Sequence, residues 1–241
     1  MRYTGNKSRI AKYILPIILN ERKPNQWFVE PFVGGANITD KVDGLRLASD
    51  YNKHLIEFYK ALQDGWTPPS RVSKTEYEDI KQNQERDSKM TVWAGICCSY
   101  GGKWFGGYLS DYQETKRLKS GRLPNHQDEA RRGLMTQIPN LISVHFIHSN
   151  YKDLEIPPNS IIYCDPPYEG TVKYKNGINH IEFWDWCREK ANQGHTIFVS
   201  EYNAPDDFEC VWQMEISNTL SKQNNFKSVE KLFKFSPTNV Q

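Results

Sequence analysis

The order of apolar and polar positions predicts strands and helices that alternate along the chain. Short runs rich in β-branched and aromatic residues, bounded by Gly, Pro or Asp, are typical of buried strands. Such runs occupy 27–29, 45–49, 143–148, 161–164, 196–199, 211–214 and 229–235. Apolar side chains recur at helical spacing in 10–18, 55–62 and 181–190, and we expect the charged segment 74–89 to form one further helix. Strands that alternate with helices indicate an α/β domain.

The alternation is interrupted between residues 67 and 140. Within this range, 98–108 combines four glycines, four aromatic rings and one lysine, and 116–122 carries four basic side chains and no acidic one. Basic side chains can neutralise phosphates, and rings can stack on bases or wedge between them. A packed local core and a solvated charged face are the competing explanations. We therefore predict one domain made of 1–66 and 141–241, with 67–140 inserted as a subdomain that presents a second substrate.

Composition narrows the class of protein. The chain has 241 residues, 38% of them hydrophobic, which is enough for one α/β domain with an insertion. A net charge of +2 neither indicates nor excludes nucleic acid. The five cysteines show no disulfide framework and no zinc spacing, which favours reduced thiols. With no signal-peptide pattern and no apolar run of membrane-spanning length, we expect a cytoplasmic protein that uses no membrane and no metal.

Polar and glycine residues with chemical potential follow the predicted strands. Gly34-Gly35 follows the first strand, although it lacks the full Gly-x-Gly-x-x-Gly spacing of a dinucleotide site. Asp50 ends the second strand, where an acid holds ribose hydroxyls in Rossmann-like sites, or it caps the next helix. Segments 150–151, 165–168 and 200–203 also follow strands. Because ligands bind at the carboxyl ends of parallel strands, we expect these residues to share one site.

The run Asp165-Pro166-Pro167-Tyr168 suits one chemical task. Proline fixes φ and has no N–H, so the chain leaves the strand in a rigid turn that holds a carboxylate, a carbonyl and a ring in place. The amine of a nucleobase is a poor nucleophile because its lone pair is delocalised into the ring. Two acceptors on its hydrogens can localise that lone pair while an aromatic face holds the base flat. A proline-stiffened loop with a chance Asp and Tyr is the alternative.

Taken together, these motifs resemble the Dam-like DNA adenine-N6 methyltransferases, which use S-adenosyl-L-methionine, and in particular their phage and prophage members. The segments 2–7, 30–35, Asp50 and 164–168 match the family's motifs in order, and 229–233 resembles its terminal strand, so the resemblance covers nearly the whole chain. The resemblance implies an α/β fold with a Rossmann-like methyltransferase sheet, mostly parallel with an antiparallel terminal strand. It also implies that the insertion is a mostly helical target-recognition subdomain.

The resemblance assigns a role to each motif residue. Catalysis falls to the run Asp165, Pro166, Pro167 and Tyr168. Cofactor contacts fall to Tyr3, Lys7, Glu30, Phe32, Gly34, Gly35, Asp50, Asn150, Tyr151 and Asp165. Among these, Lys7 is expected to face the methionine carboxylate and Asp50 the ribose. Two features depart from many relatives: the glycines are adjacent, and Asn150 replaces the acid that meets the cofactor adenine.

The implied substrate is an adenine flipped out of double-stranded DNA. Phosphate contacts are expected from Lys116, Arg117, Lys119 and Arg122, whereas Lys103, Trp104 and Tyr108 are expected to enter a groove or fill the gap left by the base. We expect the protein to act as a monomer. Two alternatives stay open: a methyltransferase acting on RNA adenine or protein glutamine, and a non-catalytic DNA-binding relative. Aspartate at position 165, rather than asparagine or serine, favours adenine.

Overall fold

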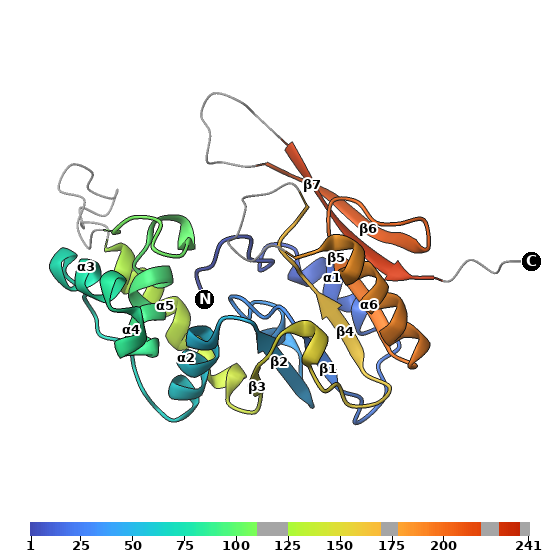
Figure 1. The fold of residues 1–241 in the computed structure, drawn as a ribbon, viewed down its shortest axis with the longest axis horizontal. Helices are drawn as coiled ribbons and strands as arrows, with labels where there is room; N and C mark the ends of the chain where they lie inside the picture. The colour runs from blue at the N-terminus through green and yellow to red at the C-terminus, as the bar shows by residue number, and fades with distance from the viewer. Residues whose placement is uncertain (110–124, 170–177, 218–226, 237–241) are drawn as a thin grey trace, which may run out of the picture.

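The computed structural model describes residues 1–109, 125–169, 178–217 and 227–236, and it contains a seven-stranded sheet beside a group of helices (Figure 1). The strands are β1 (Phe28–Glu30), β2 (Arg46–Asp50), β3 (His145–His148), β4 (Ile161–Cys164), β5 (Thr196–Ser200), β6 (Phe208–Ser217) and β7 (Lys227–Phe235). Their order is β3-β2-β1-β4-β5-β7-β6, with β1 to β5 parallel and β7 antiparallel to both neighbours. This is the predicted Rossmann-like methyltransferase sheet, and the fold class is confirmed.

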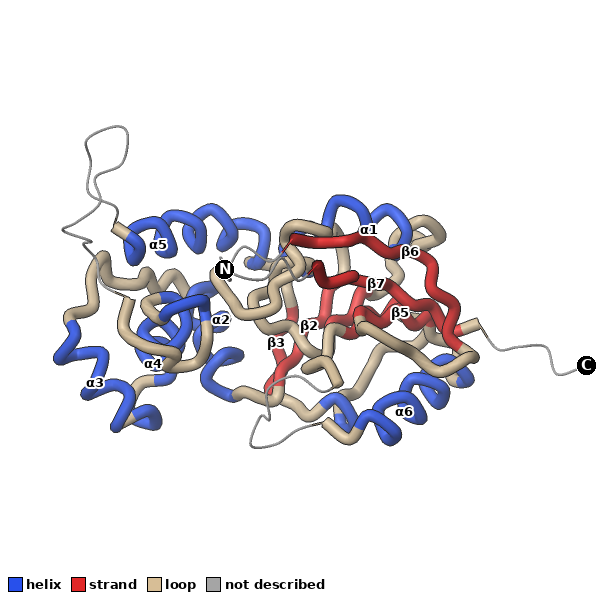
Figure 2. Tube along the Cα trace, turned by 90° about the horizontal axis from the view of Figure 1, so that it is seen from above, coloured by secondary structure: helices blue, strands red, loops and turns tan. Residues whose placement is uncertain are grey.

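Helices cover both faces of the sheet. Helix α1 (Ala11–Ile18) and helix α6 (His180–Asn192) lie on opposite sides of it (Figure 2). Because successive side chains of a strand point to opposite faces, the central strands contribute to two separate cores. The core with α1 contains Phe28, Ile161, Tyr163 and Phe198, and the core with α6 contains Val29, Ile162, Cys164 and Val199. Strands that are apolar on both faces are typical of a covered parallel sheet.

A group of helices packs beside the β3 edge of the sheet, at the left in Figure 1. It comprises α2 (Lys53–Gln63), α3 (Lys74–Gln82), α4 (Ser88–Val92) and α5 (His126–Gln137), with a π-helical turn at Trp93–Cys97 after α4. Short 3-10 helices lie at Thr39–Lys41, Gln84–Arg86, Tyr100–Gly102, Ile138–Leu141 and Tyr151–Asp153. The core of this group is continuous with the sheet, because the Tyr59 ring stacks on Phe146 with centroids 4.6 Å apart.

Two helices in this group differ from the sequence-based expectation. The single helix predicted for 74–89 is wrong, because α3 ends at Asn83 and the Asp87 carboxylate caps a new helix, α4. Helix α5 is absent from the prediction. Its buried positions include Gln127 and Gln137, so polar residues interrupt the apolar stripe by which a helix is found.

A candidate active site at the carboxyl edge of the sheet

The glycine turn after β1 and the carboxylate that ends β2 form one side of the site. The Gly34 N–H donates to Asp50 Oδ2 at 3.1 Å, and the Asn52 N–H donates to Asp50 Oδ1 at 2.9 Å. Gly34 has a φ of +44°, and a Cβ at this position would lie 2.8 Å from the Tyr3 ring, so the turn requires glycine. Burial raises the pKa of Asp50, and the two N–H donors oppose that rise. The residue that caps α2 is Asn52, so the alternative explanation of Asp50 as that cap is wrong.

The N-terminal motif links this turn to the inserted helices. The Thr4 N–H donates to the Gly102 carbonyl at 3.1 Å, and a Cβ at Gly102 would lie 2.9 Å from the Tyr3 nitrogen. From α5, the Gln137 side chain donates to the Gly35 carbonyl at 3.1 Å. The segment 67–140 therefore touches the predicted cofactor turn directly, and through the N-terminal motif as well.

The segment after β3 reaches the same edge. The Ser149 N–H donates to the Asp50 carbonyl at 3.2 Å, which brings Asn150 beside Asp50. The Tyr151 ring packs against Phe32 with centroids 5.3 Å apart. Its buried hydroxyl has no hydrogen-bond partner within the described part of the chain. Because a buried hydroxyl without a partner costs free energy, a ligand atom at Tyr151 would be stabilising.

Asp165 lies just past β4 in a buried ion pair with Lys7. The Lys7 Nζ is 2.9 Å from Asp165 Oδ1, 3.7 Å from Glu230 Oε2 on β7 and 3.0 Å from the Gly5 carbonyl oxygen. Burial raises the pKa of Asp165, and the Lys7 ammonium opposes that rise. Burial also opposes the charge on Lys7, but Asp165 and Glu230 outweigh it and raise the pKa of Lys7. The expected contact of Lys7 with the methionine carboxylate stays a prediction, and the structure adds Asp165 as its partner.

Tyr168 is held from three directions. Its hydroxyl donates to Glu230 Oε2 at 3.0 Å, the Lys7 ammonium lies 4.6 Å from its ring centroid, and the Tyr202 ring packs edge-on against it at 4.6 Å. Burial, Asp165 and Glu230 all raise the pKa of Tyr168, so its hydroxyl keeps its proton and acts as a donor. The ring predicted to carry the base is thus fixed by groups from three different segments.

Two more carboxyl groups are buried near the ion pair. Glu30, which ends β1, accepts hydrogen bonds from the Thr39 N–H at 3.1 Å and from the Thr39 hydroxyl, and burial raises the pKa of Glu30 to about 8. Glu201, just past β5, accepts from the Tyr202 N–H at 2.7 Å and the Glu169 N–H at 3.2 Å, and burial raises its pKa to about 7. Glu30 therefore links the two ends of the segment that contains the glycine turn, because it precedes Gly34 and Thr39 follows it. Glu201 links the loops that follow β4 and β5.

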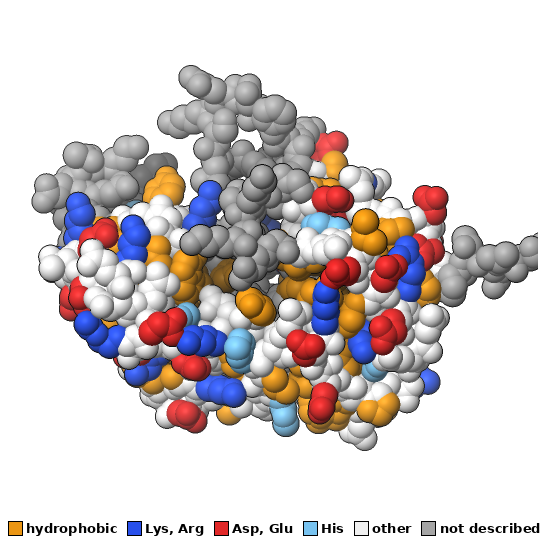
Figure 3. Space-filling view, in the orientation of Figure 1, with side chains coloured by type: hydrophobic (Ala, Val, Ile, Leu, Met, Phe, Trp, Pro, Cys, Tyr) orange, Lys and Arg blue, Asp and Glu red, His pale blue; other side chains and the backbone are white. Residues whose placement is uncertain are grey.

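The residues predicted to contact DNA differ in how far they are exposed to solvent. Lys103 and Trp104 are exposed. Tyr108 instead packs on Tyr77, with ring centroids 5.4 Å apart, and its hydroxyl donates to the Val72 carbonyl at 2.8 Å. Both ends of the Tyr108 side chain are therefore used inside the insertion, and its expected contact with DNA stays a prediction. The basic residues Lys116, Arg117, Lys119 and Arg122 lie outside the described residues. On the face shown in Figure 3, Lys and Arg side chains over the helical group are interleaved with Asp and Glu.

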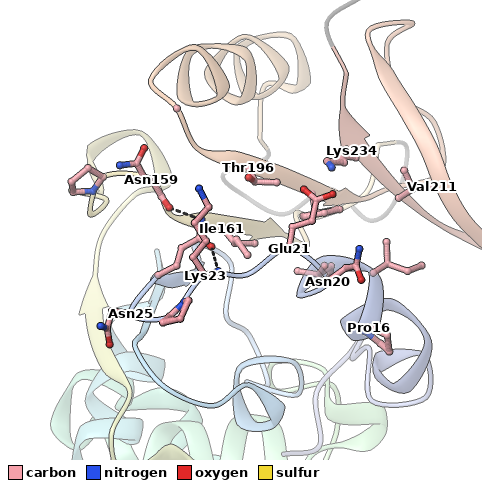
Figure 4. A pocket seen from close by; sticks show the side chains of 17 residues that line it. Pro16, Asn20, Glu21, Lys23, Asn25, Asn159, Ile161, Thr196, Val211 and Lys234 are labelled. Carbon is pink, nitrogen blue, oxygen red and sulfur yellow. Dashed lines mark hydrogen bonds between the residues drawn. The ribbon is translucent and has the colours of Figure 1, made fainter.

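A cavity of about 940 Å³ lies at the opposite edge of the sheet, where β4 and β5 begin (Figure 4). Its walls include the apolar Ile161 and Phe198, and charges of both signs from Glu21, Lys23 and Lys234. None of the predicted site residues lines it. This cavity is therefore separate from the candidate active site.

A metal-binding cluster and a membrane-spanning helix are both absent from the described residues. Within them, no group of three or more His, Cys, Asp or Glu side chains is placed to hold a metal ion. Nor does any helix there have the length and apolar content needed to cross a bilayer.

Three residues of the site receive no individual role in the sequence analysis. Glu201 and Tyr202 belong to segment 200–203, which its position after a predicted strand places in the expected site. Glu230 lies in a predicted closing strand, and that position gives its side chain no place in the site. It reaches Tyr168 and Lys7 only because β7 inserts antiparallel between β5 and β6.

The strand order and the site residues together define the class of protein. A sheet of this order, with a glycine turn after β1, an acid ending β2 and a half-buried Asp-Pro-Pro-Tyr after β4, is that of a Rossmann-like methyltransferase. Residues 3–91 match the family model of the D12 class N6 adenine-specific DNA methyltransferases. The match covers the first part of the chain only, and it confirms the resemblance to the Dam-like family that the motifs indicated.

Individual relatives agree with this family. The chain is 26% identical over 197 residues to the DNA adenine methylases of two strains of Vibrio cholerae serotype O1, covering 70% of this chain and 64% of each relative. It thus spans less than two thirds of the relatives it matches. Among solved structures, that of SMU.472, described as a candidate methyltransferase complexed with SAH, aligns at 12% identity with a TM-score of 0.41, over 98% of this chain and 54% of that one.

Proposed function

We propose that this protein transfers a methyl group from S-adenosyl-L-methionine to the N6 amine of an adenine flipped out of double-stranded DNA. The observation that carries the proposal is the buried Asp165–Lys7 pair, with 2.9 Å between Nζ and Oδ1, at the carboxyl end of β4. In this position Asp165 accepts one hydrogen of the target amine, the Pro166 carbonyl accepts the other, and Tyr168 supports the base. Asp165 is also placed to take the proton that the amine loses.

The charge state of Asp165 matters to this proposal. A buried carboxylate alone would tend to protonate and would then be a weaker acceptor. The Lys7 ammonium stabilises the anion at 2.9 Å, and the Lys7 side chain is only 7% exposed. An asparagine at this position would offer a neutral acceptor and a competing NH2. The aspartate therefore supports adenine in preference to a protein glutamine amide.

The residues at the end of β1, β2 and β3 fit S-adenosyl-L-methionine. The glycine turn lets a ligand approach the backbone, the Asp50 carboxylate suits a ribose hydroxyl pair, and the buried Tyr151 hydroxyl lacks a partner among the described residues. When bound, the cofactor supplies an electrophilic methyl group that no side chain provides. Tyr3, Lys7, Glu30, Phe32, Gly34, Gly35, Asp50, Asn150 and Tyr151 would hold it. Positioning two bound substrates in line can lower a barrier by about 7–11 kcal/mol.

In the same proposal the segment 67–140 selects the DNA sequence around the target. Lys103 and Trp104 are exposed on it, and it contacts the cofactor turn through Gln137 and the N-terminal motif through Gly102. A site that flips one base at a time needs only one copy of the chain, so we propose a monomer that acts on DNA in the cytoplasm.

The test is transfer of labelled methyl from S-adenosyl-L-methionine to duplex DNA, to single-stranded RNA and to a glutamine-containing peptide. We expect label in DNA alone, and none with Asp165→Asn. Label in RNA or peptide would favour the alternative methyltransferases. DNA binding without label in any of the three would favour a non-catalytic relative.

A further inference from the structure

Glu230 is the one charged side chain of the site that comes from the terminal antiparallel strand. Its Oε2 accepts the Tyr168 hydroxyl at 3.0 Å and lies 3.7 Å from Lys7 Nζ. The side chain is 16% exposed. These contacts tie β7 to the loop after β4 and to the N-terminal motif. Glu230 lies in 229–233, which resembles the family's terminal strand, but that resemblance implies no role for its side chain.

We propose that Glu230 is a positioning residue for methyl transfer: it orients Tyr168 through the hydroxyl and shares the charge of Lys7 with Asp165. This inference rests on the proposed function. It concerns a residue that touches neither the base nor the cofactor in that proposal, and that acts through Tyr168 and Lys7.

The first part of the argument is geometric. A rotation about χ1 swings a tyrosine ring and its hydroxyl together, so an acceptor that holds the hydroxyl restricts the position of the ring. In this site the hydroxyl is bonded to Glu230, while the Lys7 ammonium lies over the ring and the Tyr202 ring packs edge-on against it. The Glu230 bond therefore limits χ1, and together with the two ring contacts it holds the surface on which a flipped base would rest. A charge-assisted bond of this kind is also stronger than a neutral one.

The second part concerns charge. If Lys7 faced Asp165 alone, the two charges would cancel and the carboxylate would attract the target amine less strongly. With Glu230 present, the three groups Asp165, Glu230 and Lys7 carry −1, −1 and +1, a net charge of −1. A net negative site favours the positive charge that moves from sulfur toward the amine nitrogen. The neighbouring acids Glu30 and Glu201 add less, because burial raises their pKa values to about 8 and about 7.

All groups that face Glu230 enter the expected pH dependence. They are Lys7 from the N-terminal motif, Asp165 and Tyr168 from the β4 loop, Tyr163 from β4 and Tyr202 from the β5 loop. Of these, Asp165 must be ionised to accept the amine hydrogen. The Glu230 charge raises the pKa of Asp165, so its removal moves the acidic limb of turnover to lower pH.

The experiment compares Glu230→Gln with the wild-type protein, with Glu209→Gln as a matched control. Glu209 lies exposed on β6. The Gln variant keeps the size of the side chain and an oxygen that can accept the Tyr168 hydroxyl, but it loses the charge. We expect kcat to fall by about 10- to 100-fold, the change expected when a hydrogen bond to a charged group is weakened, with KM for both substrates nearly unchanged. The acidic limb of kcat should move to lower pH, and Glu209→Gln should change neither.

Two further measurements separate positioning from loss of structure. Tyr168→Phe keeps the ring and removes the hydroxyl, so the double variant with Glu230→Gln should cost less than the product of the two single effects. Calorimetry should show that Glu230→Gln reduces the preference for the cationic S-adenosylmethionine over the neutral S-adenosylhomocysteine. Additive effects, with an unmoved acidic limb and an unchanged preference, would overturn the inference while leaving the proposed function intact. A wild-type protein without methyl transfer would overturn both.

Discussion

Replacing Lys7 with methionine tests how Asp165, the carboxylate that we propose as catalytic, is kept charged. The change keeps the length of a side chain that is only 7% exposed and removes its ammonium, which lies 2.9 Å from Asp165 and 3.7 Å from Glu230. Two unit charges 2.9 Å apart attract by about 6 kcal/mol at an effective dielectric constant near 20, and desolvation of both groups offsets part of this. Removing one partner of a buried pair costs about 3–5 kcal/mol.

The sign of the pH dependence follows from Asp165. Burial raises the pKa of Asp165 and Lys7 opposes the rise, so Lys7→Met should raise that pKa further. Its carboxyl then contributes stability while protonated, below its unfolded pKa, and that stability is lost as the pH rises through the folded pKa. Turnover needs the anion and should change in the opposite direction, so the acidic limb of kcat should move to higher pH. At neutral pH we expect kcat to fall by about 100-fold or more.

The assay is kcat and KM between pH 5 and pH 9, together with urea unfolding at both ends of that range. Lys12→Met is the matched control, because Lys12 is exposed and its ammonium lies over the Tyr13 ring, 4.7 Å from the centroid. A variant that raises KM for S-adenosylmethionine, with the acidic limb in place, would refute this reasoning. Lys7 would then serve the methionine carboxylate, as the sequence motif predicts.

Three other predictions concern separate parts of the site. Asp165→Asn should abolish most of the methyl transfer while calorimetry shows nearly the same cofactor affinity; wild-type turnover in this variant would remove Asp165 from catalysis. Asp50→Ala should weaken S-adenosylhomocysteine binding by about 1.5–3 kcal/mol, the usual range for a hydrogen bond to a charged group, and an unchanged calorimetric affinity would rule out its ribose contact. Neutralising Lys119 and Arg122 should weaken binding to all DNA sequences alike and reduce the salt dependence of that binding. Changing Lys103 or Trp104 should instead reduce the penalty for a wrong base pair below the usual 1–3 kcal/mol or so, measured as methylation rates on single-base variants. If Lys119 and Arg122 altered the base preference while Lys103 and Trp104 did not, the roles assigned to these two sets of residues would be wrong.

Much of the sheet could be predicted because parallel strands buried on both faces are locally recognisable. The runs 161–164 and 196–199 need no partner to be read as strands, and both lie within observed strands. Residues that follow such runs could then be placed at one edge, which is why Asp50 and Asp165 were expected in one site. The geometry confirms that their segments meet at the carboxyl edge, while their functional roles stay predictions.

The remaining features depend on contacts between distant segments. Glu230 enters the site through the position of β7 in the sheet, which no local pattern of charges encodes. Lys7 pairs with Asp165 across more than 150 positions of sequence, so its partner could not be read from the motif. The break between α3 and α4 was missed because the Asp87 cap outweighs a charged run that otherwise suits a helix. The ring contact between Tyr108 and Tyr77 also links two elements that are far apart in sequence, so no local pattern indicates it.

The central claim is that the buried Asp165 directs methyl transfer to the N6 amine of adenine in duplex DNA. The most direct measurement is nucleoside mass spectrometry of duplex DNA incubated with S-adenosylmethionine and either the wild-type protein or Asp165→Asn. The account predicts N6-methyldeoxyadenosine with the wild-type protein, no methylated cytosine, and almost no product with the variant. Methylcytosine, or equal amounts of product from both proteins, would contradict it.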